Sequence, residues 1–249
     1  MVDTALSLGA LVGVVFSAGF VYWEVGRYAA PQVPESRFDE RKEMISYTAG
    51  LFVGVPLAIF LVLLFVSFPL FEVGGIALYL ALLVGGTELA QWYVLRTAYF
   101  GRDGAAPFYA IGFRSGIGGV LGLALVTEYL SGPSLTAPGL AGPVATALAI
   151  VMLEAVGAIL SLPSTGENPV RRGGPISGIP IAVVGFFFLG YAASIGPWVA
   201  TVGGLLVTAG ALWLYRSAAP PVLSAVSHRA PALDDGEERA PSAYGRTRP

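Results

Sequence analysis

The sequence contains no cysteine and a single histidine. Without cysteine, disulfide bonds, thiolate nucleophiles and cysteine-ligated metals are all excluded. The one histidine, His228, lies in the polar C-terminal segment. This position removes histidine-ligated haem, zinc and di-iron sites from the apolar part of the chain. We therefore expect neither a metal nor another cofactor.

Charged residues are also scarce. Only 12% of the 249 residues are charged, 55% are hydrophobic and the mean hydropathy is +0.72. A soluble protein of this size needs far more charge to cover its surface. Instead, apolar runs of about twenty residues recur, and this is the length that crosses a bilayer core. The composition indicates an all-α membrane protein surrounded by lipid, and we expect no nucleic-acid partner.

Lysine is almost missing: thirteen of the fourteen basic residues are arginine, and the exception is Lys42. This bias indicates a GC-rich genome and, with a pI near 5.4, is compatible with a halophilic prokaryote. A retinal protein needs a lysine in its last span to form the Schiff base. Because no lysine follows Lys42, that class of seven-helix protein is excluded.

Hydropathy predicts seven transmembrane helices. The first is not read as a cleaved signal peptide, because Asp3 is its only early charge and its apolar run is too long. The predicted spans cover residues 4–26, 44–67, 71–98, 108–130, 143–163, 175–194 and 197–216.

The basic residues that flank these spans predict the orientation. Nine of them follow the odd-numbered spans, and the other connections contain none. By the positive-inside rule, the N-terminus is expected outside the cell and the C-terminus in the cytoplasm. We expect the protein to be a multi-pass protein of the plasma membrane. The nine residues are Arg27, Arg37, Arg41, Lys42, Arg96, Arg102, Arg171, Arg172 and Arg216.

The composition changes after the last span. Residues 218–249 are rich in proline, alanine, serine and charge, and they cannot bury enough apolar surface to fold. We therefore predict a seven-helix transmembrane domain over residues 1–217 and a disordered cytoplasmic tail over residues 218–249.

Proline and glycine predict how the helices bend and pack. Pro56 and Pro180 interrupt apolar spans and predict helix kinks, and their positions correspond if spans one to three and five to seven are parallel repeats. Glycine pairs four residues apart, such as Gly9 with Gly13 and Gly50 with Gly54, predict close helix contacts. These contacts are expected within the chain more than between copies, so a homo-oligomer or a membrane-protein partner remains open.

Three ionisable residues fall inside the predicted hydrocarbon layer: Glu88, Arg114 and Glu154. Glu88, Gln91, Trp92 and Arg96 have the spacing of one helix face, which predicts a polar stripe turned toward protein or water. Exposing such groups to lipid would cost several kcal/mol each. Glu24, in contrast, lies at a predicted span end, as do Arg27, Glu72 and Glu128, and we expect these groups at the interface.

The charge count in this buried polar cluster leaves two interpretations open. Two carboxylates and one arginine leave one negative charge, which in a low-dielectric site must be protonated or hold a cation. This favours a transport or channel-like protein for a small solute or ion, with Glu88, Gln91, Arg114 and Glu154 lining the path. The alternative is a non-catalytic subunit or scaffold in which Arg114 locks the helices together.

An enzyme is the least favoured class. The stretch Thr87–Gln91 resembles the glutamate-pair motif of the CAAX-type and PrsW-type membrane proteases, but Leu89 replaces the second glutamate. A serine nucleophile in a span would have neither histidine nor lysine as its base. A divergent membrane-embedded enzyme is therefore kept only as a second alternative.

Overall fold

The structure is a computed structural model, and it describes residues 2–29, 38–67, 78–101, 105–130, 137–161 and 178–228. The described residues are almost entirely helical and include no strand. Several expectations concern residues outside these ranges. They are Arg37, Glu72, Arg102, Arg171, Arg172 and the tail beyond residue 228.

The first predicted span is one run of helix that contains two π-helical segments. It consists of α1 (Val2–Ala10), η1 (Leu11–Val15), α2 (Phe16–Glu24) and η2 (Val25–Ala29). The third span has a similar break: a helical turn at residues 78–80 leads into the π-helical segment η3 (Ala81–Gly86) and then α5 (Thr87–Leu95). A π-helical turn inside an α-helix commonly marks a functional site.

The remaining helices are regular. The longer ones are α3 (Glu40–Ser67), α7 (Ala106–Leu130), α8 (Ala137–Leu160), α9 (Gly178–Ile195) and α10 (Pro197–His228), and α6 (Ala98–Gly101) is a single turn.

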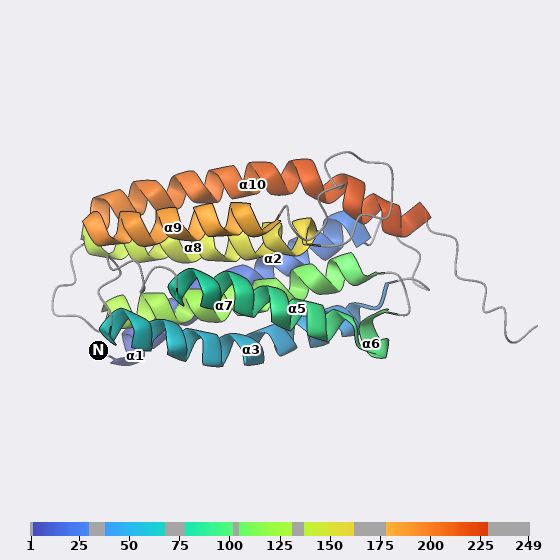
Figure 1. Cartoon of the computed structure of the whole chain (residues 1–249), viewed down its shortest axis with the longest axis horizontal. Helices are drawn as coiled ribbons and strands as arrows, with labels where there is room; N and C mark the ends of the chain where they lie inside the picture. The colour runs from blue at the N-terminus through green and yellow to red at the C-terminus, as the bar shows by residue number, and fades with distance from the viewer. Residues whose placement is uncertain are drawn as a thin grey trace, which may run out of the picture.

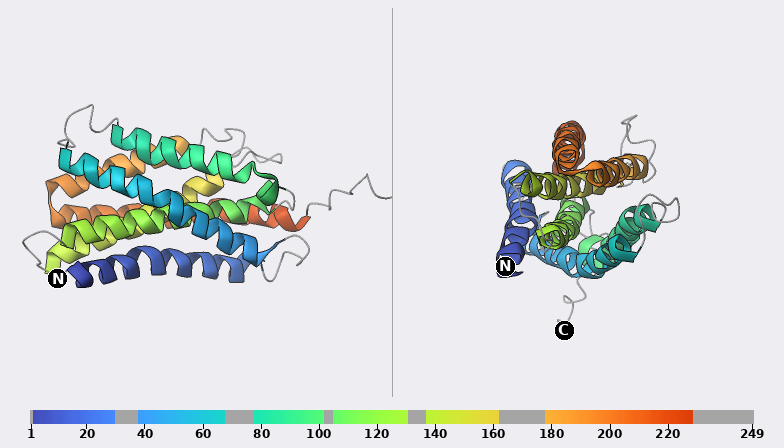
Figure 2. Two further views of the ribbon diagram at one scale, coloured as in Figure 1. Left: turned by 90° about the horizontal axis from the view of Figure 1, so that it is seen from below. Right: turned by 90° about the vertical axis from the view of Figure 1, so that its left-hand side faces the viewer.

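All the long helices run along one axis and form a bundle (Figure 1). Their directions alternate, so the end of α5 lies at the same end of the bundle as the start of α3 and the start of α7. Seen end-on, α7 is surrounded by the other helices (Figure 2), and it contacts α1, α2, α3, α5, α8 and α10. Every residue of α7 from Phe108 to Gly122 is buried, so α7 is the central helix of the bundle.

Within the described residues, six helices are long and apolar enough to cross a membrane, and α9 is apolar but shorter. The structure therefore supports a multi-pass membrane protein. The last helix is longer than predicted: α10 continues to His228, and Ala219, Val222 and Leu223 are buried. The helix passes the predicted tail boundary at residue 218 because apolar residues beyond it pack on the bundle.

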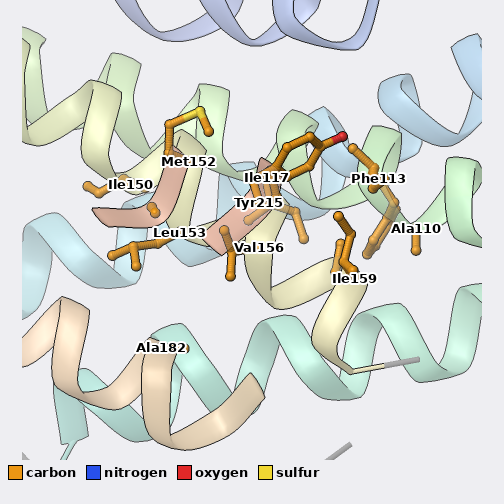
Figure 3. Packing of buried hydrophobic residues seen from close by; sticks show 14 of the residues in the cluster. Ala110, Phe113, Ile117, Ile150, Met152, Leu153, Val156, Ile159, Ala182 and Tyr215 are labelled. Atoms are coloured by element: carbon orange, nitrogen blue, oxygen red, sulfur yellow. The ribbon is translucent and has the colours of Figure 1, made fainter. Parts of the chain in front are cut away.

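The core includes residues of most of the long helices, and its part around α7, α8 and α10 is shown in Figure 3. Phe113 and Ile117 of α7, Val156 and Ile159 of α8 and Tyr215 of α10 belong to one buried cluster. This apolar packing fixes the spacing between the helices that carry the buried charges.

Glycine lets α3 and η1 approach α7 closely. A Cβ atom on Gly50 would overlap the carbonyl oxygen of Phe113, and one on Gly13 would overlap that of Gly119. Both obstacles are backbone, so neither could move aside. The small-residue pairs are thus packing contacts within the chain, where they bring polar groups of neighbouring helices together.

The structure describes the two prolines to different extents. Pro56 lies inside α3 and removes a backbone hydrogen bond there. Pro180 is the third described residue of α9, and the residues directly before Gly178 lie outside the described ranges. The kink at Pro180, and the repeat that rests on it, therefore stay predictions.

Candidate functional site: a buried arginine between two glutamates

Arg114 lies on the central helix with its side chain completely buried. Its Nε donates to Oε2 of Glu154 on α8 over 2.7 Å, and its Nη1 donates to Oε1 of Glu88 on α5 over 2.6 Å. These two ion pairs connect three helices that are far apart in sequence. The Arg114 cluster, as we call it, consists of Glu88, Arg114 and Glu154 with the neutral groups described next.

Three neutral side chains complete the contacts of the guanidinium. Nη2 donates to Oγ1 of Thr87 over 3.0 Å, and Nη1 lies 3.3 Å from Oε1 of Gln91 and 3.5 Å from Oγ of Ser161. The Ser161 hydroxyl in turn donates to Glu88 Oε1 over 2.7 Å. Every nitrogen of the guanidinium therefore has an acceptor, as a buried arginine requires.

The local structure makes room for this arrangement. The π-helical segment η3 ends directly before Thr87, and the Thr87 hydroxyl donates back to the carbonyl of Leu83 over 2.6 Å. That bond orients its oxygen to accept from Arg114. On α8, a Cβ atom at Gly157 would lie 2.9 Å from Cζ of Arg114, so only glycine leaves space for the flat guanidinium at this position.

The cluster is not fully neutralised. Its two carboxylates and one guanidinium carry a net charge of −1 when all are ionised. Oε1 of Glu154 is buried without a hydrogen-bond partner, while the Glu88 side chain is 17% exposed. Glu88 is thus the member of the cluster through which a proton or cation could enter, and Glu154 is the member that is closed off.

The structure brings Glu88, Gln91, Arg114 and Glu154 together, but it divides the predicted polar stripe on α5. Gln91 is buried, whereas Trp92 is 55% exposed and Arg96 stacks over its ring at 4.0 Å. The seam with α7 runs along Thr87 and Gln91, four residues apart, and Glu88 lies at its edge. Trp92 and Arg96 therefore face outward, away from the Arg114 cluster.

Sequence reasoning missed Thr87, Gly157 and Ser161. Gly157 follows Glu154 by three residues and Ser161 follows it by seven. That spacing places Glu154, Gly157 and Ser161 on one side of α8 and of the residue directly after it. The signal was present, but it is carried by small residues that are common elsewhere in the chain.

Two further acids lie where the sequence did not predict them. Glu24, expected at the interface, is fully buried, and Glu43, just before the predicted second span, is 1% exposed. Both side chains point into the bundle because α10 and α7 pack over them. Hydropathy places charges at span ends in the interface, but it cannot tell which of them a neighbouring helix covers.

No family model, curated protein or solved structure matches this chain. Within the described residues, no three acidic or histidine side chains gather as metal ligands would. The chemistry of the site therefore has to be inferred from its own geometry. That geometry can hold a positive charge between two negative ones, and it can exchange a proton or cation at the partly exposed carboxylate.

Proposed function

We propose that this chain is a membrane transport or channel-like protein for a small solute or ion, coupled to protons or cations through Glu88 and Glu154. In this proposal it crosses the plasma membrane seven times, with the N-terminus outside and the C-terminus in the cytoplasm. The seven apolar helices and the alternation of basic connections support this topology.

The observation that carries the proposal is that Arg114 bonds two carboxylates that differ in their exposure. The guanidinium bonds one carboxylate that is sealed from solvent and one that is 17% exposed, and the group retains one surplus negative charge. A proton or cation arriving at Glu88 would cancel that charge and weaken the Glu88 contact to Arg114. Because Glu88 is on α5 and Arg114 on α7, loading would loosen the attachment of α5 to the central helix.

A second candidate function is a non-transporting subunit or scaffold. It is favoured by the complete burial of Arg114 and by its bonds to two other helices. In that case the cluster is a lock, because breaking a buried ion pair by removing one partner costs about 3–5 kcal/mol. The work of the protein would then be done by a partner in the bilayer.

Neutralising each acid separates the two candidates. Glu88→Gln and Glu154→Gln keep the shape of the side chain and remove its charge. The purified variants are placed in liposomes that contain a pH-sensitive dye, and proton uptake is driven by a potassium gradient with an ionophore. Glu128→Gln is the matched control, because Glu128 is an exposed glutamate at the far end of α7.

For a coupled transporter we expect both variants to unfold at nearly the wild-type temperature and their proton uptake to fall to the level of protein-free liposomes. The Glu128→Gln protein should retain wild-type uptake. Variants that unfold at much lower temperature, together with wild-type liposomes that take up no protons, would favour the scaffold.

A further inference from the structure

Glu24 and Glu43 form a second buried acidic pair on the other side of the central helix. Glu43 contacts the backbone of Gly112, and a Cβ atom there would overlap its Oε1. Gly112 precedes Arg114 by two residues, which in an α-helix is a rotation of about 200°. The pair therefore lies on nearly the opposite face of α7 from the Arg114 cluster.

The carboxylates of this pair are buried without compensation. Glu24 is 0% and Glu43 1% exposed, and within the described part of the chain their oxygens form no hydrogen bond of standard geometry, although the Tyr215 hydroxyl and the Gly112 backbone lie close to them. The two side chains are close enough to repel each other as anions. The Tyr215 side chain of α10 lies beside Glu24 and offers one hydroxyl.

The cations of the surrounding helices are placed elsewhere. Arg114 bonds Glu88 and Glu154, Arg27 stacks over the Trp23 ring, and Lys42 over the Tyr99 ring. Arg216 of α10 is exposed. Among the described residues, no arginine or lysine forms an ion pair with Glu24 or Glu43. Two adjacent bare anions in this setting would be very costly, so the pair requires a positive charge.

A line of hydroxyl groups leads away from the pair along the same face of α7. The Ser115 hydroxyl, one turn from Gly112, is buried and has no hydrogen-bond partner within the described residues. One turn further, the hydroxyls of Ser17 and Tyr47 bond each other over 2.9 Å beside Gly119. Ser17 precedes Glu24 by seven residues and Tyr47 follows Glu43 by four, so each shares a helix face with one acid.

We infer that Glu24 and Glu43 are a proton-binding site, in which a bound proton keeps the buried pair from carrying two negative charges. A proton needs no coordination shell, which suits a pair packed tightly against Gly112 and Tyr215. Hydroxyls can both accept and donate, so the Ser115, Ser17 and Tyr47 groups extend the site toward the other half of the bundle. This site is separate from the Arg114 cluster and does not depend on transport.

Infrared spectroscopy tests the inference without any flux measurement. A protonated carboxylic acid has a carbonyl stretch above that of a carboxylate, and we expect this band in the wild-type protein at neutral pH. Glu24→Gln and Glu43→Gln should each reduce it, and the double variant should reduce it further. Glu128→Gln should leave it unchanged. Wild-type protein without the band, or with a band that both variants retain, would overturn the inference.

The same infrared band, measured while sodium is titrated, gives a second test. If a metal cation and not a proton neutralises the pair, the acid band should appear only when sodium is removed, and the inference is then wrong.

If the variants do not fold, a hydrophobic carbodiimide that reacts with protonated carboxyls is applied to the folded wild-type protein. Mapped labelling at Glu24 or Glu43 supports the site. Labelling of neither residue, while acid-denatured protein is labelled at both, contradicts it.

Discussion

The two faces of α7 hold buried carboxylates under opposite conditions. On one face, Arg114 reaches Glu88 and Glu154 over 2.6 and 2.7 Å, and hydroxyl and amide groups fill its other bonding positions. On the other face, Glu24 and Glu43 are buried as completely as Glu154, and more completely than Glu88, but they have no ion pair within the described residues. The same burial therefore produces two kinds of site, because the counter-charge is present on only one side.

This difference assigns the stability of the bundle to one face of α7 and the gain and loss of charge to the other. The Arg114 cluster connects α5, α7 and α8, so its bonds contribute to holding the bundle together. The Glu24 and Glu43 pair forms no such bonds, and neutral side chains of the same shape should serve its packing equally well. A bundle held firmly on one face of its central helix can tolerate a site on the other face that gains and loses charge.

Removing the guanidinium should have the largest effect. Arg114→Met leaves two buried carboxylates without a counter-charge, and we expect a loss of about 3–5 kcal/mol in the free energy of unfolding. Thermal unfolding in detergent micelles, followed by circular dichroism, measures it. Adding Glu88→Gln and Glu154→Gln to the same protein should restore most of the loss.

The control for this prediction is Arg216→Met, since Arg216 is an exposed arginine on α10. It should unfold within a degree or two of wild type, as surface substitutions usually do. Equal losses at the two arginines would mean that the ion pairs around Arg114 do not stabilise the fold.

An intermediate effect is expected from the glycines that make room for the two groups of acids. Gly157→Ala places a Cβ atom 2.9 Å from the guanidinium carbon, which is fixed by its bonds, and should cost about 1–3 kcal/mol. Gly112→Ala meets mainly the end of the Glu43 side chain, which no ion pair among the described residues holds in place. The gain in helix propensity, up to about 1 kcal/mol, should offset much of that cost.

Gly210→Ala is the reference for both substitutions, because a Cβ atom there meets nothing within 4 Å. We expect the unfolding temperatures to follow the order Gly210→Ala, Gly112→Ala, Gly157→Ala from highest to lowest. If Gly112→Ala is the most damaging, the Glu43 carboxylate is held as firmly as Arg114, and the contrast between the faces is lost.

Much of the fold could be predicted because it depends on local composition. Apolar runs of about twenty residues mark each helix, and Arg114, Glu88 and Glu154 could be matched by their depth in the bilayer. Burial at helix ends could not be predicted, because it depends on which neighbour packs there. Glu24 is covered next to Tyr215, and no signal in its own segment shows this.

The smallest effect should come from Ser161, whose hydroxyl donates to Glu88 Oε1 over 2.7 Å. Ser161→Ala removes one hydrogen bond but neither ion pair, so a loss of about 1 kcal/mol is expected. Ser217→Ala removes an exposed serine hydroxyl and should be silent. A double-mutant cycle with Glu88→Gln then measures the coupling between Ser161 and the charge of Glu88. Full additivity would mean that the hydroxyl does not sense that charge, and Ser161 would then no longer belong to the Arg114 cluster.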